Sequence, residues 1–449
     1  MSLFVLVFVM AILVLGFGSA IIWRGNLVLL MLLPASEFLG FVDPMKIAVR
    51  GMFDIHALIL LIIIGSVALS IFRIKDFFLA ELFRPIFLFF LFWLYGVFNP
   101  LLSGNSSLFY SIKSSKEFLT VFSFVAILLF LRTKKDVDFG WKCLIGLGLY
   151  YSVLEISGQF IGPLLKEKMS YHMRVEEGFF WKIYAPLWPV ILLALFSSYY
   201  NSALKLSRPF VKLSVSAVGL LLTFFRSYLL AALVALPVVL FINGQGLVRT
   251  FSRATLLFFS ICFCLLLIGA VTFSMGGKFA SVDRIADKFF VSAVKELATQ
   301  TGGALKGREN VTVAKRKLLR EESIAGYGFI DKDSKFGKKI SKIIRGDNLG
   351  FIDMGVLDVP IKFGYVGFCL LLLNVIYIIY LLRKMALSSE SDEFKVRCMS
   401  VAAMIITFIL VLPVHAPFTY SYGLLPLGIS LGLIEKERIL LAEESQAAL

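Results

Sequence analysis

Long stretches without a charged residue recur along the whole chain, and they restrict its possible folds more than any other feature. About 20 apolar residues form a helix long enough to cross the hydrocarbon core of a membrane. The 449 residues are 59% hydrophobic and 17% charged, with a mean hydropathy of +0.88, which is far from the composition of a soluble domain. We therefore predict an all-α polytopic membrane protein. The charge-free stretches are Met1–Trp23, Ile55–Phe72, Pro85–Ile112, Ile183–Leu204, Ala254–Gly277, Phe363–Leu382 and Cys398–Ile434.

The short basic loops predict the orientation of these helices. Cytoplasmic loops are enriched in Lys and Arg, and placing all the short basic loops on that side gives 12–13 spans with a cytoplasmic C-terminus. Met1–Trp23 lacks the basic start and the cleavage site of a signal peptide, so we expect it to remain as the first span. The basic loops are Arg73–Arg84, Arg132–Lys142, Lys205–Lys212, Arg249–Arg253 and Arg383–Arg397, with Lys436 and Arg438 after the last span. The predicted spans are 3–22, 26–42, 55–72, 85–101, 118–131, 141–162, 180–200, 210–225, 227–246, 254–275, 359–382, 398–412 and 416–434.

One long hydrophilic loop, residues 276–356, is predicted on the outer face. It separates the N-terminal transmembrane helices, residues 1–275, from the C-terminal helices and short tail, residues 357–449. Within the loop, 283–298 and 310–321 have apolar residues at helical spacing, so we expect two amphipathic helices on the membrane surface. The loop carries more Lys and Arg than Asp and Glu. This basic charge is suited to anionic headgroups or polyanionic glycans, although a solvated helix face is the alternative for any single residue.

Two arginines are candidate ligands for phosphate groups. Arg226 is the one charge in the stretch 213–248, which must cross the membrane twice if both its ends are cytoplasmic. An arginine at such a reversal is a candidate functional residue, because its planar guanidinium binds phosphate in a bidentate manner. The alternative is an arginine that reaches lipid headgroups. Arg308 is expected at the start of a loop helix, where the backbone N–H groups also favour an anion.

Four further residues are candidates for acid–base chemistry or anion binding. His172, Arg174 and Glu176 lie together before the span that starts near residue 180; His172 or Glu176 can serve as a general base and Arg174 as a phosphate ligand. Anchoring at the membrane interface is the alternative for all three. Asp347 lies where the long loop returns to the membrane, and it is either a helix cap or a carboxylate that accepts a proton.

No metal, cofactor or nucleic acid is expected. The five cysteines lie within or at the ends of apolar segments and match no zinc or haem spacing. His56 beside Asp54 is interpreted as part of the polar start of a helix. His415 is interpreted as a histidine whose hydrogen bonds are satisfied in a tight outer turn. Neither histidine has metal-ligand spacing. Nucleic acid binding is excluded because the chain has no soluble basic domain to hold it.

The order of several short motifs resembles the O-antigen polymerase and O-antigen ligase superfamily. The resemblance covers residues 170–385, and the order and spacing carry it rather than any one motif. The motifs are Arg226-Ser227 at a span end, Gly307-Arg308 at the start of a loop helix, Gly-Tyr-Gly-Phe at Gly326–Phe329, a polar-Asn pair at Asp347-Asn348, and Phe-Gly-Tyr-Val-Gly at Phe363–Gly367.

The resemblance implies a metal-independent glycosyltransferase of the bacterial inner membrane, with a fold related to C-type glycosyltransferases and an active site facing the periplasm. Its donor and acceptor would be undecaprenyl-diphosphate-linked glycans, with membrane lipids and a chain-length regulator as further partners. Arg226, Arg308 and Arg174 would then bind the diphosphate, and Asp347 would be the general base, with Glu176 or His172 as substitutes.

Three functions are compatible with this resemblance or with the hydropathy. The ligases have a His before the Asn at the end of the loop, where this chain has Asp347. That departure favours a polymerase, which joins repeat units, over an O-antigen ligase, which transfers the glycan to lipid A-core. A glycolipid flippase is the third possibility, but transporters usually show repeat symmetry or broken helices with polar sites at the midplane, and the sequence indicates neither.

Overall fold

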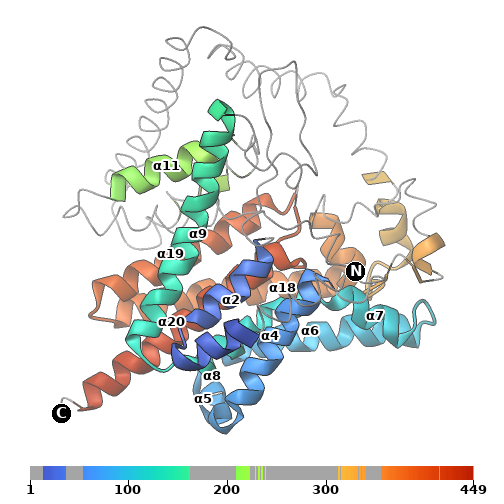
Figure 1. The fold of residues 1–449 in the computed structure, drawn as a ribbon. Coiled ribbons are helices and arrows are strands. Elements are labelled where there is room, and N and C mark those ends of the chain that lie inside the picture. Colours follow the sequence, from blue (N-terminus) through green and yellow to red (C-terminus); the bar gives the residue numbers. More distant parts are fainter. Residues whose placement is uncertain are drawn as a thin grey trace. The chain divides into compact units, whose positions relative to one another are not determined.

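The computed structural model of the protein is built from helices (Figure 1). Among the described residues, α6, α18 and α19 are each long and apolar enough to cross a membrane. A fourth span results if α4 and the helical segment after it, which are bent by 70°, count as one. Their length and apolar composition are those expected for a membrane protein. The described residues are 14–36, 54–161, 209–222, 228, 231, 232, 234, 235, 238, 312–339 except 314, 332 and 335, 355–413 and 415–447.

Thirteen elements have bounds within this part of the chain. Most are α-helices, and η1 and η2 are short 3₁₀ helices. They are α2 Asn26–Ala35, α4 Ile55–Leu69, η1 Ile71–Arg73, α5 Ile74–Leu79, α6 Phe83–Leu102, α7 Leu108–Ser115, η2 Phe118–Phe122, α8 Ser123–Phe130, α9 Lys134–Ile161, α11 Pro209–Leu222, α18 Gly355–Ser388, α19 Asp392–Val411 and α20 Ser421–Ala447.

The chain forms two compact units. The first comprises residues 1–145, 314–401 and 412–449, and the second comprises 146–313 and 402–411. In the described part of the second unit, α11 approaches the later half of α9 so closely that a side chain at Gly219 would overlap Ser152. The polar clusters described below belong to the first unit.

The short helix α8 forms the core of the first unit. Its residues from Ser123 to Phe130 are all buried except Val125, and α8 contacts α4, α5 and α20. Helix α20 approaches closely because Gly428 and Gly432 face η2 and α8; a Cβ on either would overlap Val121 or Ile127. Two glycines four residues apart let helices pack backbone to backbone.

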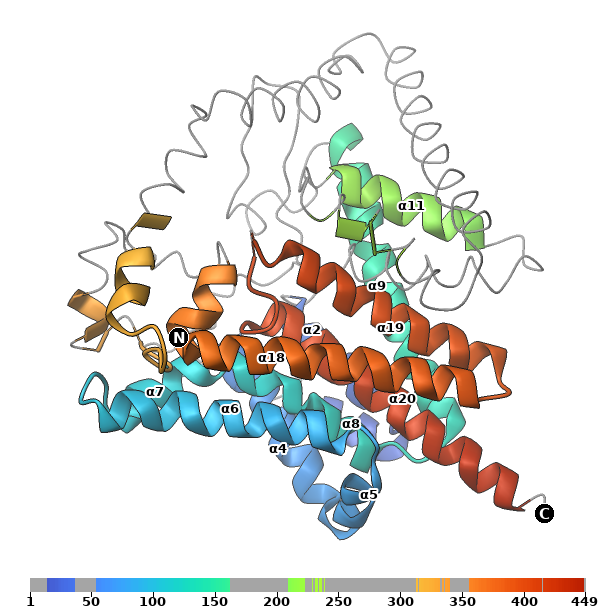
Figure 2. The same cartoon turned by 180° about the vertical axis from the view of Figure 1, so that it is seen from behind.

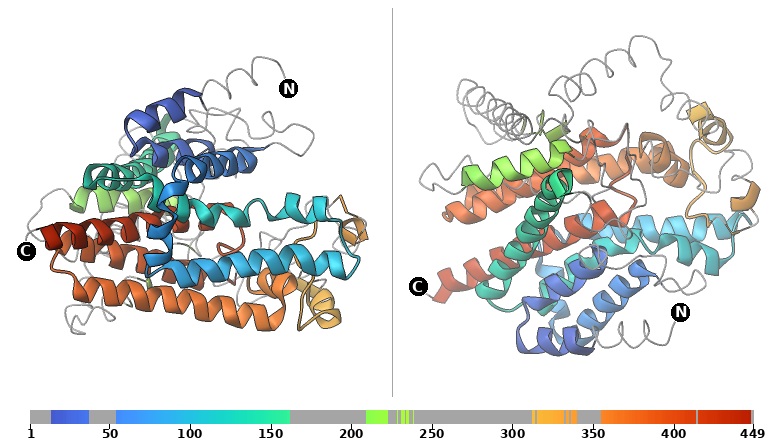
Figure 3. Two further views of the ribbon diagram at one scale, coloured as in Figure 1. Left: turned by 90° about the horizontal axis from the view of Figure 1, so that it is seen from below. Right: turned by 45° about the horizontal axis from the view of Figure 1, so that its top comes forward.

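Helices α6 and α18 of the first unit run side by side (Figure 2; Figure 3, left).

The first unit has polar clusters at both ends of its apolar helices. We call the end where α4, α18 and α20 begin the loop end, because residues 322–339 also lie there, and the opposite end, where α20 finishes, the tail end. At the tail end, buried Glu435 accepts hydrogen bonds from the backbone N–H groups of Glu81 and Leu82, which precede α6. These helix-start donors have no intrahelical partner, so Glu435 caps α6.

A buried arginine also joins elements at the tail end. Arg397 of α19 pairs with Asp138, Glu393 and Glu437, and its guanidinium lies 5.7 Å from the Trp141 ring centroid. Four segments predicted on the cytoplasmic side therefore meet at this end. They are the segments that contain Glu81, Asp138, Arg397 and Arg438.

Several predicted spans coincide with observed helices but differ in length. The span predicted at 359–382 is the central part of α18, and the span at 398–412 is the later part of α19. The predicted span 118–131 is instead η2 followed by α8, a break that the apolar sequence does not reveal. The last helix begins at Ser421 rather than at 416. Predicted spans between α9 and α18 lie mostly outside the described residues, as do the loop helix 283–298, the start of the loop helix 310–321 and the turn into α18.

Candidate functional site

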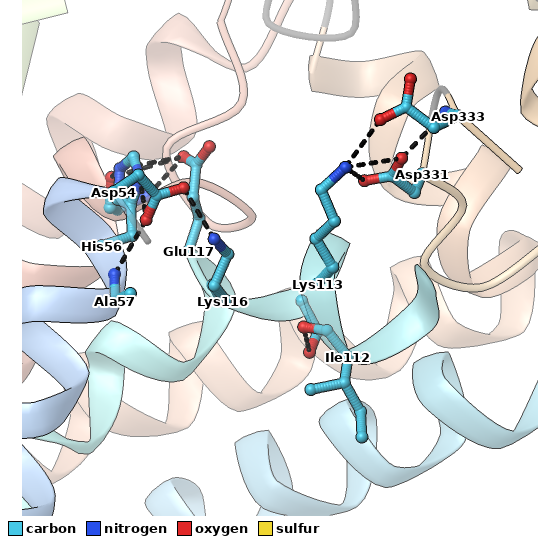
Figure 4. Close-up of polar contacts among 11 residues, drawn as sticks. Asp54, His56, Ala57, Ile112, Lys113, Lys116, Glu117, Asp331 and Asp333 are labelled. Atoms are coloured by element: carbon cyan, nitrogen blue, oxygen red, sulfur yellow. Dashed lines mark hydrogen bonds and ion pairs between the residues drawn. The ribbon is translucent and has the colours of Figure 1, made fainter. Parts of the chain in front are cut away.

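Five polar side chains converge at the loop end, and we call them the loop-end cluster. Figure 4 labels four of them, Asp54, His56, Lys116 and Glu117. Asp54 precedes α4 and His56 lies in its first turn; Lys116 and Glu117 lie between α7 and η2, and Ser421 begins α20. In each of the three segments, the residues that follow these polar side chains are part of the apolar core. The polar side chains therefore lie together at the loop end. The loop-end cluster therefore joins residues that are more than 300 positions apart in sequence.

Asp54 is fixed by two different contacts. Its Oδ1 accepts the N–H of Ala57 at 2.9 Å, which makes it the N-cap of α4, and its Oδ2 accepts Lys116 Nζ at 2.7 Å. Partial burial alone would raise the pKa of this carboxyl, but the hydrogen bonds from Lys116 and Ala57 outweigh it, so the pKa is lowered. Asp54 is therefore an anion that stabilises the start of α4, as the sequence interpretation predicts.

His56 lies between two carboxylates. Its Nε2 is 2.8 Å from Ser421 Oγ and 3.9 Å from Glu117 Oε2, and its Nδ1 is 4.0 Å from Asp54 Oδ1. Ser421 also donates both its N–H and its hydroxyl to Glu117 Oε2, each at 3.3 Å. About a third of the His56, Asp54 and Glu117 side chains is exposed, so the loop-end cluster is open to a ligand.

A second polar group continues from the loop-end cluster along the segment before α20. Thr419 donates to Asp358 Oδ2 at 3.0 Å, and Lys362 pairs with the same oxygen at 2.9 Å. The Lys362 ammonium also lies 4.2 Å from the centroid of the Tyr420 ring. Asp358 is fully buried.

The motif Gly326–Phe329 joins α6 to a break in α18. Helix α18 departs from helical geometry at Gly364, which has a φ of 70°. The carbonyls of Ile361 and Lys362 next to the break accept the N–H groups of Tyr327 and Gly328, at 2.7 and 2.8 Å. The motif Gly326–Phe329 is therefore bonded to the turn of α18 directly before Phe363–Gly367, and Tyr365 of that second motif donates its N–H to the Ser323 carbonyl at 2.9 Å.

The same junction uses a carbonyl that a proline leaves free in α6. Pro100 has no N–H, so the carbonyl of Gly96 lacks its usual partner four residues later. Phe329 donates its N–H to that carbonyl at 2.7 Å, and Asn99 Nδ2 donates to the Gly326 carbonyl at 2.8 Å. One short loop, Gly326–Phe329, thus pairs with the free backbone carbonyls of both α6 and α18.

Aromatic packing fixes this junction to the core. The rings of Phe118, Phe329 and Phe363 are mutually in contact, with centroids 5.4 to 5.8 Å apart. All three side chains are buried, and such aromatic contacts contribute beyond their apolar area. Phe118 directly follows Glu117, so the same packing also positions the loop-end cluster.

A lysine attaches the next part of the loop to α7. Lys113 Nζ lies 3.2 Å from both oxygens of Asp331 and 2.7 Å from Asp333 Oδ2. Burial lowers the pKa of the ammonium, but the hydrogen bonds from Lys113 to Asp333 and Asp331 outweigh burial and raise it. Figure 4 shows Lys113 directed toward these aspartates, while Lys116 and Glu117 point to the other side.

All six residues that the sequence analysis names as site candidates lie outside the described residues. They are the three arginines Arg174, Arg226 and Arg308, and the three acid–base candidates His172, Glu176 and Asp347. Their roles remain predictions. Among the described residues, no group of three or more His, Cys, Asp or Glu could hold a metal ion.

The sequence alone predicts no site role for Lys116, Glu117 or Ser421, and it indicates His56 only as part of a helix start. A usable signal was present, because Asp54, Glu117 and the residues around Ser421 all lie near predicted span ends on the same side of the membrane. Hydropathy does not reveal which of those span ends are neighbours. No protein-family model matches the chain, and no curated protein matches its sequence.

Proposed function

We propose that the protein is a metal-independent glycosyltransferase that joins undecaprenyl-diphosphate-linked repeat units into a polysaccharide at the periplasmic face of the bacterial inner membrane. The observation that carries this proposal is the junction of Gly326–Phe329 with α18: its backbone bonds to Ile361 and Lys362, directly before Phe363–Gly367, and the Phe329 ring contacts Phe363. Both segments belong to the set of motifs that resembles the polymerase and ligase superfamily. These contacts support the view that the two segments are parts of one functional unit.

The position of the polar residues also supports a reaction at a membrane boundary. A lipid-linked donor keeps its tail among apolar helices and its diphosphate at the helix ends. In the described part of the first unit, polar groups are concentrated at such ends, and the loop end carries an accessible cluster of Asp54, His56, Lys116, Glu117 and Ser421.

The proposed chemistry requires two kinds of group. Diphosphate is a good leaving group when preorganised cations stabilise the developing negative charge, and Arg226, Arg308 and Arg174 are the sequence-predicted cations. The acceptor hydroxyl requires a general base, for which the sequence favours Asp347.

The direct test is reconstitution. Purified protein in proteoliposomes is supplied with undecaprenyl-diphosphate-linked repeat units in excess chelator, and the products are separated by size. We expect a ladder of lipid-linked oligomers. Products that remain single repeat units with an intact, inserted protein would contradict the proposal, and activity that disappears with EDTA and returns with magnesium would contradict its metal independence.

A further inference from the structure

The contact between His56 Nε2 and Ser421 Oγ, at 2.8 Å, fits either tautomer of the imidazole ring. In the tautomer with the hydrogen on Nε2, the Ser421 oxygen accepts from His56 and the Ser421 hydroxyl donates to Glu117 Oε2 at 3.3 Å. The lone pair of the ring then lies on Nδ1.

The Nδ1 lone pair has no hydrogen-bond donor among the described residues. Asp54 Oδ1 lies 4.0 Å from it, which is too far for a hydrogen bond. Two hydrogen bonds of about 2.8 Å can together span this distance, so one hydroxyl oxygen can be within reach of both atoms. The exposed fraction of the His56 side chain, 29%, leaves it within reach of a ligand.

We propose that His56, in place of the sequence-predicted Asp347, is the general base that takes the proton from the acceptor sugar hydroxyl, and that the position between Nδ1 and Asp54 is the subsite for this hydroxyl. This inference rests on the proposed glycosyl transfer. The ligand class is a saccharide hydroxyl at the non-reducing end of a lipid-linked glycan.

The reaction balances without any further reagent. The acceptor oxygen forms a bond to the anomeric carbon of the donor, and the bond from that carbon to the diphosphate oxygen breaks. The electron pair leaves with the diphosphate, and the hydroxyl proton moves to His56 Nδ1. Asp54 and Glu117, on opposite sides of the ring, stabilise the imidazolium, while Lys116 neutralises part of the charge of Asp54.

The same contacts argue against Ser421 as a nucleophile. Acyl transfer by a serine needs an activated hydroxyl and free backbone N–H groups for the oxyanion. The Ser421 hydroxyl and its own N–H both already donate to Glu117. Ser421 is therefore a positioning residue that connects His56 to Glu117.

The experiment compares single-turnover glycan transfer by wild type, His56→Gln, His56→Ala and Ser421→Ala, with Asp333→Asn as the control. Gln can keep the donor that reaches Ser421, but it has no basic nitrogen. The control removes a carboxylate at the same end of the molecule, one that is not in the loop-end cluster. Folding is checked for each variant by its melting temperature in detergent.

We expect His56→Gln to transfer about 10²–10⁴ times more slowly while melting like the wild type. Added imidazole should restore part of the rate to His56→Ala, which a purely structural role does not allow.

Two results would overturn the inference in distinguishable ways. Transfer by His56→Gln at the wild-type rate, with no effect of added imidazole on His56→Ala, would remove His56 from the chemistry and leave the proposed function standing. Wild-type protein that is folded and inserted but transfers nothing would overturn the proposed function and this inference with it.

Discussion

A glycine can be required by its backbone conformation or by the lack of space for a Cβ atom, and Gly104 and Gly364 differ in the second respect. Both have positive φ, 70° and 69°, and Gly364, with a ψ of 174°, lies in a region that is essentially restricted to glycine. Nothing lies within 4 Å of the Cβ position at Gly104, whereas a Cβ at Gly364 would overlap the carbonyl of Ile324. The junction therefore constrains Gly364 sterically as well as conformationally.

We predict that Gly364→Ala destabilises the folded protein clearly more than Gly104→Ala. Gly104→Ala should cost only the roughly 1–2 kcal/mol of the backbone conformation, while Gly364→Ala must also displace the loop at Ile324. Melting temperatures of the purified variants in one detergent measure the difference. Equal losses would show that the close contact at Gly364 does not exist.

Asp54 gives a pH-dependent prediction at the residue scale. Because its pKa is lowered in the folded state, the stability it supplies is present above the ordinary carboxyl pKa and is lost as the pH falls through the folded-state value. Asp54→Ala should cost about 0.5–2 kcal/mol near neutral pH through the lost cap, and Asp54→Asn should cost less because Asn also caps helices.

The measurement is thermal stability from neutral to strongly acidic pH for wild type and Asp54→Asn. The difference between the two should shrink on acidification, since protonated Asp54 no longer pairs with Lys116. A constant difference across the range would mean that the ion pair with Lys116 contributes nothing.

At the scale of elements, helix α20 depends on two glycines to approach α8. A Cβ at Gly428 would overlap the Val121 carbonyl and Ser123 Oγ, so Gly428→Ala should destabilise by about 1–3 kcal/mol, as for other overpacked sites. Gly146 in α9 has open space around its Cβ position, and Gly146→Ala should be neutral or slightly stabilising because Ala favours helix. Denaturant titration of both variants tests this; an unaffected Gly428→Ala would contradict the close packing.

Sequence patterns located the long apolar helices well but not their ends. Hydropathy detected the apolar centre of α18, while its observed start at Gly355 includes Asp358, a charge that Lys362 and Thr419 satisfy. Likewise α20 continues to Ala447 through charged residues, of which Glu435 and Arg438 are paired. The first charged residue beyond an apolar stretch therefore does not mark the end of a helix. Partners from distant segments pair with that charge, so the helix can continue through it.

The candidate site was less predictable than the helices for a related reason. Asp54 as a helix cap follows from local sequence, since Asp is a preferred N-cap residue. The contact between His56 and Ser421 joins positions 365 apart, and no local pattern encodes such a contact. The junction at Gly364 likewise depends on hydrogen bonds between the α18 carbonyls next to the break and the loop Gly326–Phe329. Hydropathy contains no information on such backbone pairing.

At the scale of the whole molecule, the predicted arginines and the loop-end cluster have separate proposed roles. Removing Arg226 or Arg308 by substitution with Ala should reduce glycan transfer roughly 10²–10³-fold, as when one preorganised charge-stabilising group is lost. Lys should rescue only in part because it lacks the planar fork. Transfer assays at matched membrane levels measure this, and near-normal polymer from Arg226→Ala would remove that arginine from the mechanism.

The central claim is that the acceptor is a lipid-linked glycan, and the glycans of a deletion strain test it most directly. Without a polymerase, the lipid A-core should still receive a single repeat unit, which gives one discrete band instead of a ladder on a gel. If the product is a capsule or exopolysaccharide, that polymer should vanish while the core is unchanged. Bare core together with accumulated long lipid-linked polymer would contradict the account and identify a ligase.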